Sequence, residues 1–325
     1  MNSFLPIQYK DNKLVLLDQR ELPLKEEFVT CCTLEDGHDA IRDMVVRGAP
    51  CIGFTAIFTL ALWIKDNETF THEALKEAGS FLNKARPTAV NLKYEIDQVI
   101  NMLKEINDKS KAYKMVVNYG LKQIDESEKN NRKMSEYVFQ HLRNNNKKEK
   151  YNILTHCNTG FLACGSIGTA LGVIQIMHEQ EAVDTVYVDE TRPYLQGARL
   201  TAYELNKLNV NHRVVVEGAA SYLMKNGLVD AIVVGADRIA ANGDTANKVG
   251  TSNLSIIAKH YGIPFYVIAP TSSFDSNTSS GESIKIELRN EEEILNYKDH
   301  RIAPHESKAL NPSFDITDSS LITGI

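Results

Sequence analysis

The chain has 325 residues, 43% of them hydrophobic and 24% charged, a composition that fits a globular protein of about two domains and excludes disordered and fibrous classes. Its 36 basic and 42 acidic residues give a net charge of -6, so it lacks the overall positive field that attracts nucleic acids and anionic membranes. A ligand that carries phosphate would need a local site.

The first part of the chain, residues 1–148, is predicted to be a helical domain with a small β-sheet. Short apolar runs on either side of residues 10–13 predict a β-hairpin. Apolar residues then recur at helical spacing, with breaks at RGAP (47–50) and at RPTAVN (86–91). The helical segments are 34–46, 51–63, 71–84 and 92–106, followed by a long polar helical region. The run NNNKKEK (144–150) is interpreted as a solvated linker, because it has no interleaved aromatic residues to stack on nucleic acid bases.

Three features predict a cytoplasmic protein without membrane contacts. The stretches 48–64 and 151–178 contain no Asp, Glu, Lys or Arg, but Gly, Pro or polar residues interrupt them, so we expect buried core segments. The N-terminal segment (1–13) lacks the basic-then-apolar pattern of a secretory signal. Five cysteines without a C-x-x-C pair argue against a disulfide framework or a zinc site and favour a reducing compartment.

Residues 149–325 alternate between apolar runs typical of strands and helical patterns. The strand candidates are 152–155, 185–188, 213–216, 231–234 and 265–268, and helical patterns such as 168–178 and 197–208 separate most of them. This order predicts a Rossmann-like domain with a doubly wound parallel sheet. The turn after the first strand, HCNTGFLACGSIG, lacks the G-x-G-x-x-G fingerprint, so a dinucleotide cofactor is not expected.

Polar residues follow three of the predicted strands. His156 and Cys157 come after the first strand, the segment DETRP (189–193) after the second, and Asp237 after the fourth. Because the carboxyl ends of parallel strands meet at one edge of a sheet, we expect these residues to line one crevice. A thiol near a helix N-terminus has its thiolate favoured, while a carboxyl group at a dry strand end tends to stay protonated. Cys157 and Asp237 are therefore a candidate base and acid for proton transfer.

Each of these residues also has a structural interpretation. A cysteine at a strand end is often a buried small hydrophobe, and Arg192 could simply pair with Asp189 or Glu190. His156 is more often a structural residue than a metal ligand. No H-x-x-x-H or C-x-x-C spacing lies near it, so no metal is expected.

The segment GADRIAANGDTANKVGT (235–251) follows a buried strand and is predicted to bind phosphate. A helix is expected from about residue 247 to 260, with Asp244 or Thr245 as its N-cap. A helix start offers free N–H groups and a positive dipole end, and Lys248 adds a charge. The alternative is an Asp that caps a turn and a Lys that is solvated.

Segments throughout the chain resemble the methylthioribose-1-phosphate isomerase family. They are IRDMVVRGAPCIG (41–53), RPTAVNL (86–92), THCNTG (155–160), DETRPYLQGARLTAYEL (189–205), GADRIAANGDTANKVGT (235–251), IPFYVIAP (263–270) and NPSFDIT (311–317). The segments cover nearly the whole chain, in order and at compact spacing, so the resemblance is specific. Relatives of this family include ribose-1,5-bisphosphate isomerases, isomerases of 5-deoxyribose 1-phosphate and noncatalytic regulatory subunits of a translation-initiation exchange factor.

The resemblance implies roles for individual residues. Cys157 and Asp237 correspond to the catalytic thiol and acid. The substrate-binding positions fall on Arg47, Gly48, Ala49, Arg86, Gln196, Asn247 and Lys248. The resemblance further implies a small sugar-phosphate substrate, no metal or other cofactor, no nucleic acid partner and a homodimer. Chains of the family would continue a short way beyond the position of Ile325, so this chain is interpreted as a naturally short or a truncated form.

The implied reaction converts an aldose to a ketose while the C1 oxygen carries phosphate. This phosphate locks the sugar ring, so an acid must protonate the ring oxygen while a base moves the C2 proton to C1. A direct hydride shift from C2 to C1 remains an alternative. The resemblance is weaker at residues 161–167 and at Lys93-Tyr94, which bear on the group accepted at C5. By resemblance, methylthioribose 1-phosphate ranks first, 5-deoxyribose 1-phosphate second and ribose 1,5-bisphosphate third.

Two other classes of protein stay open. A noncatalytic exchange-factor subunit would share this architecture, but it would have no reason to keep Cys157 and Asp237 together with the RGAP and TANK segments. A Rossmann-type oxidoreductase would need the glycine fingerprint, which is missing. A nucleotide titration separates the oxidoreductase from the isomerase.

Overall fold

The computed structural model describes residues 5–68, 70–87, 89–297 and 300–325. The chain packs as two compact units, residues 1–131 with 160–168 and residues 132–159 with 169–325. The division between the two units falls inside a long helix, Lys109–Asn145, whereas the sequence placed the domain boundary at residue 148. Thr88, in the segment RPTAVNL, lies outside the described residues.

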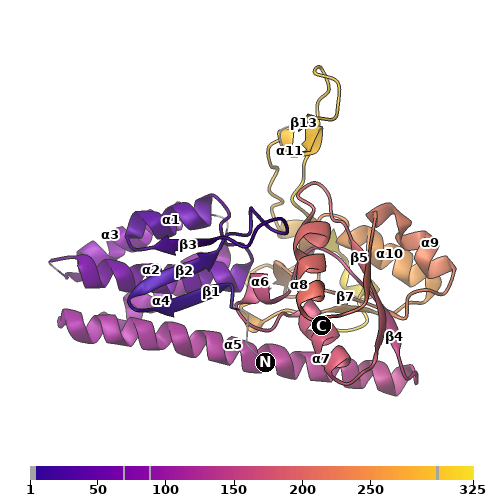
Figure 1. Cartoon of the computed structure of the whole chain (residues 1–325), viewed down its shortest axis with the longest axis horizontal. Coiled ribbons are helices and arrows are strands. Elements are labelled where there is room, and N and C mark those ends of the chain that lie inside the picture. The colour runs from indigo at the N-terminus through magenta and orange to yellow at the C-terminus, as the bar shows by residue number, and fades with distance from the viewer. Residues whose placement is uncertain (1–4, 69, 88, 298–299) are drawn as a thin grey trace. The chain divides into compact units, whose positions relative to one another are not determined.

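The first unit combines a three-stranded antiparallel sheet with helices (Figure 1). Its elements are β1 (Ile7–Lys10), β2 (Lys13–Leu17), β3 (Phe28–Cys31), α1 (Leu34–Arg42), α2 (Ala49–Asp66), α3 (His72–Asn83), α4 (Val90–Met102), the first part of α5 (Lys109–Asn145) and the single turn α6 (Phe161–Cys164). The β1–β2 hairpin and the helices confirm the expected helical domain with a small sheet.

Helix α2 is the centre of the first unit, because it is apolar on nearly every side. Pro50 stands in its first turn, where a missing N–H group costs no helical hydrogen bond. By length and composition α2 is the one helix among the described residues that could cross a membrane, but 72% of it is buried. The residues that cover it come from α1, α3, α4 and the β-sheet. It is therefore a core helix, as predicted for residues 48–64.

The second unit is built on a five-stranded parallel sheet in the order β10-β7-β4-β5-β6. The strands are β4 (Tyr151–Thr155), β5 (Val183–Asp189), β6 (His212–Val215), β7 (Ala231–Val234) and β10 (Phe265–Val267). The chain begins at β4, adds β5 and β6 on one side, and then adds β7 and β10 on the other. Because crossovers are right-handed, this reversal places helices on opposite faces of the sheet, and the doubly wound prediction is confirmed. The topological switch point lies between β4 and β7.

Helices and short helical turns connect these strands. They are α7 (Ala170–Glu179), the π-helical η1 (Gly197–Thr201), α8 (Ala202–Lys207), η2 (Glu217–Ala219), α9 (Ala220–Lys225), α10 (Thr251–Tyr261), η3 (Thr271–Ser273), η4 (Gly281–Ser283) and η5 (Ser319–Leu321). Helix α7 packs against β4, β5 and β7. Apolar side chains from β7, α9, α10 and β10 form one buried cluster of this unit.

A second, four-stranded sheet lies in the same unit and was not predicted from the sequence. Its order is β11-β8-β9-β14, with β11 (Phe274–Asp275), β8 (Arg238–Ala240), β9 (Thr245–Lys248) and β14 (Phe314–Thr317). The prediction that a helix begins near residue 247 is wrong, because residues 245–248 pair as a strand with both β8 and β14. Helix α10 begins three residues later, at Thr251.

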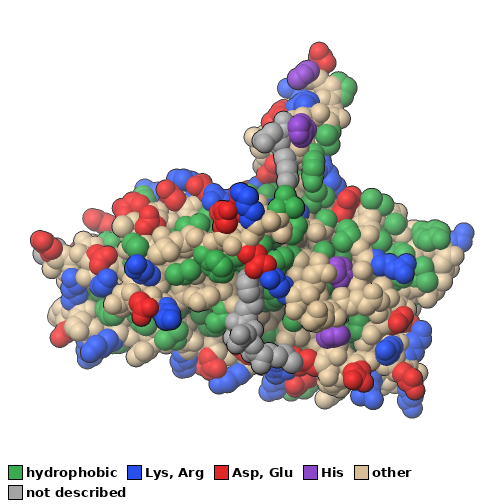
Figure 2. Space-filling view, viewed as in Figure 1, with side chains coloured by type: hydrophobic (Ala, Val, Ile, Leu, Met, Phe, Trp, Pro, Cys, Tyr) green, Lys and Arg blue, Asp and Glu red, His purple; other side chains and the backbone are tan. Residues whose placement is uncertain are grey.

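An extended segment projects from the second unit and carries α11 (Glu292–Leu295), β12 (Asn296–Tyr297) and β13 (His300–Arg301) (Figure 1). Hydrophobic side chains are visible along this projection in Figure 2. Leu288, Ile302 and Leu310 expose 64%, 60% and 74% of their surface. Such exposure of large apolar residues is unusual on one segment and marks a surface suited to association.

Candidate functional site

The carboxyl ends of β4, β5 and β7 carry the residues that the sequence singled out. Cys157 lies two residues after β4, the segment 189–193 begins at the last residue of β5, and Asp237 lies three residues after β7. The loops after β4 and β7 approach closely, since a Cβ atom on Gly235 would lie 2.5 Å from Cγ2 of Thr159. The loops after β4 and β7 therefore meet at the switch point of the sheet, and a single crevice lined by all these residues stays a prediction.

Cys157 is held by its own backbone in an uncommon conformation. Its φ is 63°, in the left-handed region that non-glycine residues seldom adopt. Its N–H donates to Oγ1 of Thr191 at 2.9 Å, and its carbonyl oxygen accepts from Oγ1 of Thr201 at 2.6 Å. The residue is buried, with 8% of its surface exposed. Two fixed backbone bonds and a strained φ together set the direction of the thiol.

The helix dipole expected behind this thiol is weak. The helix that follows Cys157 is α6, a single turn of four residues, and the longer α7 begins only at Ala170. A macrodipole needs several aligned peptide units. The expectation that a helix N-terminus favours the thiolate is therefore not supported by this geometry.

Thr191 is itself held by hydrogen bonds to its own loop and to the half-buried carboxylate of Glu217. Its φ is 65°, and its hydroxyl donates to the carbonyl oxygen of Asp189 at 2.9 Å while accepting from Cys157. The two carboxylate oxygens of Glu217 accept the N–H groups of Thr191 and Arg192 at 3.0 and 2.9 Å. The guanidinium of Arg192 donates to the carbonyl oxygens of Pro193 and Ile294. Glu217 thus supports the loop that supports Cys157.

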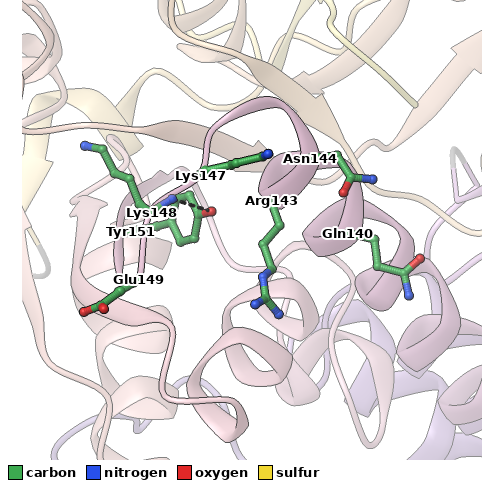
Figure 3. A pocket seen from close by; sticks show the side chains of 7 residues that line it. All are labelled: Gln140, Arg143, Asn144, Lys147, Lys148, Glu149 and Tyr151. Atoms are coloured by element: carbon green, nitrogen blue, oxygen red, sulfur yellow. Dashed lines mark hydrogen bonds between the residues drawn. The ribbon is translucent and has the colours of Figure 1, made fainter.

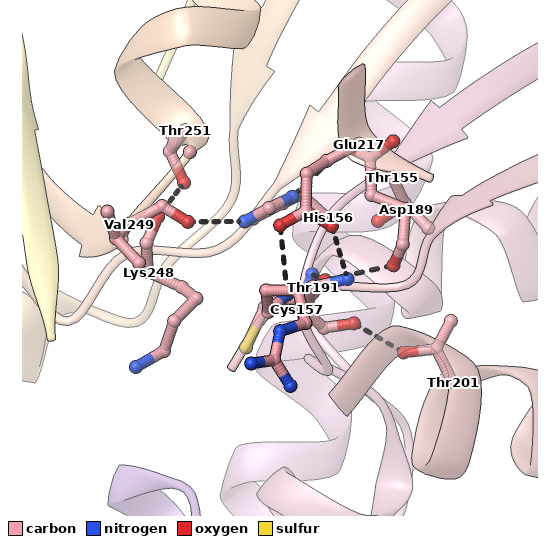
Figure 4. A network of polar contacts seen from close by, with 12 residues as sticks. Thr155, His156, Cys157, Asp189, Thr191, Thr201, Glu217, Lys248, Val249 and Thr251 are labelled. Carbon is pink, nitrogen blue, oxygen red and sulfur yellow. Dashed lines mark hydrogen bonds and ion pairs between the residues drawn. The ribbon is translucent and has the colours of Figure 1, made fainter. Parts of the chain in front are cut away.

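His156 and Asp189 form a fully buried pair beside Cys157 (Figure 4). Nδ1 of His156 lies 3.0 Å from Oδ2 of Asp189, and Nε2 lies 2.9 Å from the carbonyl oxygen of Val249. Burial raises the pKa of the Asp189 carboxyl group, against the opposing effect of the bond to His156. His156 therefore connects the loop after β4 with the loop that precedes α10.

The helix start that was predicted to hold phosphate is already occupied. Gly250 caps α10 with a φ of 104°, and its N–H donates to Oδ2 of Asp315 at 2.7 Å. The N–H of Ser252 donates to Oδ1 of the same carboxylate at 3.1 Å. Asp315 comes from β14, which pairs with β9. An internal carboxylate takes the place that the sequence suggested for a phosphate group, so this part of the prediction is wrong.

Asn247 and Lys248 lie at the end of β9 instead of on a helix. The Asn247 side chain is buried and its Nδ2 donates to Oγ1 of Thr251 at 3.0 Å. Nζ of Lys248 donates to the carbonyl oxygen of Ser313 at 2.8 Å and lies 4.9 Å from the centre of the Phe314 ring. In Figure 4 the Lys248 side chain and the Cys157 thiol point toward the same side of the network. Lys248 is half-buried, held by a carbonyl group and an aromatic face.

Asp237 does not lie at a dry strand end. Strand β7 ends at Val234, and the N–H of Asp237 donates to the carbonyl oxygen of Ala246 at 2.9 Å, just before β8 begins. The residue is exposed. The expectation that burial keeps this acid protonated is therefore not met in this structure.

Gln196 is buried and precedes the π-helical turn η1. The close packing behind it requires glycine at the next position, since a Cβ atom on Gly197 would lie 1.7 Å from the carbonyl oxygen of Asp189. π-Helical turns are rare and often occur at functional sites. This turn places Gln196 in the same loop as Thr191.

The remaining predicted residues belong to the first unit. Arg47 is buried with 9% of its surface exposed, and Arg86 is half-buried after α3. Gly48 has a φ of 85°, and a Cβ atom there would lie 2.5 Å from Cβ of Ala163. Gly48 therefore packs against α6, which belongs to the same unit of the chain.

A cavity also lies away from these residues. It has a volume of about 670 Å³ and lies at the C-terminal end of α5, where Arg143, Lys147 and Lys148 are among its lining residues (Figure 3). Nζ of Lys148 is already paired with Oδ1 of Asp230 at 2.6 Å. None of the predicted site residues lines this cavity. Within the described ranges, no group of three or more His, Cys, Asp or Glu side chains is arranged to hold a metal ion.

Several residues of the site were not identified from the sequence. Glu217 lies in a segment without a motif, Asp315 lies in the segment NPSFDIT, which was marked by resemblance alone, and Thr201 falls in a segment that was interpreted as an ordinary helix. His156 was interpreted as a structural residue, and its pairing with Asp189 depends on a contact across 33 positions of the chain. The one feature of the sequence that pointed to His156 was its position directly before Cys157.

The family of the chain follows from comparison with known proteins. The model of the Initiation factor 2 subunit family matches residues 45–325. A methylthioribose-1-phosphate isomerase of Caldicellulosiruptor saccharolyticus is 45% identical over 322 residues, which cover 98% of this chain and 93% of the relative.

Two solved structures share the whole architecture. The 5-methylthioribose 1-phosphate isomerase of Pyrococcus horikoshii OT3 has a TM-score of 0.91 and 38% identity, covering 99% of this chain and 90% of that one. The delta subunit of translation initiation factor eIF-2B from A. fulgidus has a TM-score of 0.88 and 36% identity, covering 99% and 93%. The chain belongs to the Initiation factor 2 subunit family.

Proposed function

We propose that this protein is an aldose-ketose isomerase that converts 5-methylthioribose 1-phosphate to 5-methylthioribulose 1-phosphate, a reaction of methionine salvage. The observation that carries the proposal is the fixed Cys157, whose N–H and carbonyl groups are both bound at the switch point of the sheet. Ligands bind at such switch points in open parallel sheets. The isomerases that resemble this chain over nearly its full length support the same substrate.

The chemistry requires one base and one acid. The phosphate on the C1 oxygen prevents spontaneous ring opening, so Asp237 is proposed to protonate the ring oxygen. Cys157 is proposed to take the proton from C2 and return it to C1. A buried thiol in a fixed orientation suits this role, because the distance to C2 must stay within hydrogen-bond reach during the transfer. No cofactor takes part in this scheme, because the carbon skeleton keeps its overall oxidation state.

Exposure of Asp237 affects how this acid would act. The Asp237 side chain is exposed to solvent. Bound substrate would cover the group and remove water from it, which favours the protonated form. The acid role of Asp237 is therefore proposed for the complex with substrate.

The phosphate group is proposed to bind Lys248, together with Arg47 or Arg86. A net-acidic chain must supply positive charge locally for such a ligand. Gln196 and Asn247 are proposed to bind the sugar, and by resemblance Gly48 and Ala49 are proposed as further substrate-binding residues. The half-buried position of Lys248 over Phe314 restricts its side chain in advance, which lowers the entropy lost on binding.

A second candidate function is that of a noncatalytic subunit like the delta subunit of eIF-2B. The similarity of the A. fulgidus structure favours it, because 36% identity extends over 99% of this chain. A regulatory subunit gains nothing from a strained cysteine that its neighbours hold at a positive φ. The isomerase is therefore preferred.

One assay distinguishes these functions and the alternative substrates. Purified protein is incubated separately with methylthioribose 1-phosphate, 5-deoxyribose 1-phosphate and ribose 1,5-bisphosphate, and ketose formation is followed. We expect the highest kcat/KM with the methylthio sugar and a modest preference over the methyl sugar, since small apolar groups differ by about 1 to 3 kcal/mol. A strong preference for the bisphosphate contradicts the proposed substrate. Turnover of none of the three supports the noncatalytic subunit.

We also propose that the protein is a cytoplasmic homodimer. The resemblance to the isomerase family supports the dimer, and so do the exposed apolar side chains of the projecting segment. Symmetric dimers are the commonest assembly of soluble proteins. Five cysteines without a disulfide agree with a reducing compartment.

A further inference from the structure

The buried His156 has both ring nitrogens in use, which limits where its protons can be. The carbonyl oxygen of Val249 only accepts hydrogen bonds, so Nε2 must carry a proton at the observed distance of 2.9 Å. A single proton then lies between Nδ1 and Oδ2 of Asp189, 3.0 Å apart. Either both groups are charged, or a neutral imidazole accepts from a carboxylic acid.

The surroundings of the other carboxyl oxygen of Asp189, Oδ1, distinguish the charged pair from the neutral pair. No donor lies within hydrogen-bond distance of Oδ1 among the residues that the structure describes, and the side chain has no exposed surface. An ionised oxygen buried without a donor is costly, whereas the carbonyl oxygen of a neutral acid tolerates this much better. Burial also raises the pKa of this carboxyl group, and the nearby charge of Glu217 acts in the same direction. The neutral pair is favoured.

The pair connects the two loops that carry the proposed base and the proposed phosphate ligand. Cys157 follows His156 directly, and Lys248 precedes Val249 directly. The His156 ring also packs on Gly250, where a Cβ atom would lie 2.9 Å from Cε1. A positive charge on this ring would also act to lower the pKa of Asp315, whose carboxylate accepts the N–H of Gly250. A shift of this ring therefore moves the end of β9 relative to the Cys157 loop.

We propose that His156 and Asp189 are positioning residues for the reaction: Asp189, as a neutral acid, donates to Nδ1 of His156, and the Nε2–H group holds the Val249 carbonyl. This arrangement fixes the spacing between the Cys157 thiol and Lys248. Neither residue touches the reacting atoms. The role deepens the proposed isomerase function and depends on it for its kinetic consequences.

The proton arrangement is tested without any substrate. Protein with nitrogen-15-labelled histidine is measured by NMR, and His156 signals are assigned by their loss in His156→Gln. We expect one protonated and one unprotonated ring nitrogen across neutral pH, as in the neutral Nε2–H tautomer. Two protonated nitrogens would show an imidazolium paired with a carboxylate and would overturn the neutral pair.

The positioning role is tested with variants that remove one contact at a time. His156→Gln keeps an N–H group near the Nε2 position and the bond to Val249, while His156→Asn reaches only toward Asp189. We expect His156→Asn to raise KM by about tenfold, the scale of one lost buried hydrogen bond, and His156→Gln to raise it much less. Equal KM and kcat in the two variants would show that the Val249 contact positions nothing.

Asp189→Asn provides the conservative rescue. The amide keeps the two features of a neutral acid that the pair uses, because one N–H of its NH₂ group can donate to Nδ1 and its oxygen can stay unpaired; its second N–H is the one group that the acid lacks. We expect kcat/KM to stay within about threefold of the parent, a small fraction of the loss in His156→Asn. A loss as large as that of His156→Asn would overturn the proposal. Circular dichroism and thermal unfolding confirm that each variant is folded. If the parent protein turns over none of the sugar phosphates, the proposed function fails, while the NMR result still decides the proton arrangement.

Discussion

At the scale of single residues, the site depends on threonine hydroxyls as much as on its reactive groups. Thr191 and Thr201 hold the two backbone groups of Cys157, and both are fully buried. Because these bonds involve the backbone of Cys157, its thiol keeps the same direction when it is protonated and when it is deprotonated. Because the backbone holds the residue in place, a substitution at the sulfur atom changes the reactivity of the side chain and leaves its position unchanged.

Replacement of Cys157 by serine is expected to lower kcat by about 10²-fold to 10⁴-fold with little change in KM. A thiol titrates near pH 8.5 in water, whereas a serine hydroxyl does not ionise near neutral pH. Steady-state kinetics with methylthioribose 1-phosphate measure the effect, and Cys32→Ser, at an exposed cysteine, is the matched control. Near-normal turnover of Cys157→Ser would end the base assignment and favour a hydride shift. The double variant with Asp237→Asn should lose much less than the product of the single losses, because groups that act as a unit are not additive.

Replacement of Lys248 by alanine is expected to raise KM by about tenfold or more, because one charge-assisted bond to phosphate is lost. The change in kcat should be small if the contact is equally strong in the ground state and the transition state. Lys259→Ala, in the last turn of α10, is the control for the removal of one positive charge. An unchanged KM with a lower kcat would place Lys248 in the chemical step.

The sequence singled out Cys157, Asp237 and Lys248 as candidates because each lies next to a predicted strand or a turn signal, and their roles stay predictions. It did not show their surroundings. The burial of His156 and Asp189 arises from contacts between distant strands, and the exposure of Asp237 depends on where β7 ends. Such surroundings follow from tertiary packing, which a local pattern does not contain.

At the scale of elements, the two ends of α10 differ in what their glycines do. Gly250 and Gly262 both have a positive φ, of 104° and 70°. A Cβ atom on Gly250 would press on His156, whereas nothing lies within 4 Å of one on Gly262. The N-terminal glycine is thus needed for packing as well as for conformation, and the C-terminal one for conformation alone.

Gly250→Ala and Gly262→Ala therefore form a matched pair. Each substitution is expected to cost about 1 kcal/mol of unfolding free energy through backbone strain, and more at Gly250 because of the contact with the ring. Only Gly250→Ala should also lower kcat/KM, by about tenfold, because it moves the His156 ring. Urea unfolding and steady-state kinetics measure the two effects. Equal kinetics in both variants would show that the ring position does not affect the site.

Asp244 ties three segments of the second unit together, and its effect on stability should depend on pH. Its carboxylate accepts N–H groups from Gly281 and Ser319 and the side-chain amide of Asn242. Although burial acts to raise the pKa of Asp244, these bonds hold it below the usual value. A depressed pKa contributes stability that is present above the unfolded value, near pH 4, and is lost as the pH falls through the folded value.

Asp244→Ala is expected to lower the free energy of unfolding by about 1 to 3 kcal/mol at pH 7. The difference from the parent should shrink below about pH 4, as the parent carboxylate becomes protonated. Urea unfolding at several pH values measures it, with Asp318→Ala as the control for an exposed Asp that caps one short turn. A difference that is constant with pH would contradict the role of the charge.

The elements themselves were largely predictable where a segment is long and periodic. Helices α1 to α4 and the five parallel strands lie close to their predicted ranges. The segment 245–248 was assigned to a helix because turn residues precede it, but strand pairing with β8 and β14 outweighs that local preference. The partner strand β14 lies 66 positions further along the chain, so no local window could reveal it.

At the scale of the whole molecule, the proposed homodimer has a simple test. Light scattering or sedimentation at micromolar concentration is expected to give twice the chain mass of 36.4 kDa. Replacing Leu288, Ile302 and Leu310 by serine should weaken the dimer if a second copy covers the projecting segment, because apolar burial drives such contacts. A monomeric mass for the parent would contradict the dimer. A dimer unchanged in the triple variant would place the interface elsewhere.

The way the chain passes between its units has a consequence for dissection of the protein. Residues 160–168 belong to the first unit, although the residues on both sides of them belong to the second. A single cut at residue 131 would leave the first unit without α6, on which Gly48 packs, and would leave the second unit with an unpartnered apolar turn. Neither fragment should therefore fold as it does in the intact chain. Limited proteolysis is expected to release no stable half, and genes that encode the two units separately should yield insoluble products. Exchange of either unit with that of a relative would have to move two separate pieces of the chain together, 1–131 with 160–168 or 132–159 with 169–325.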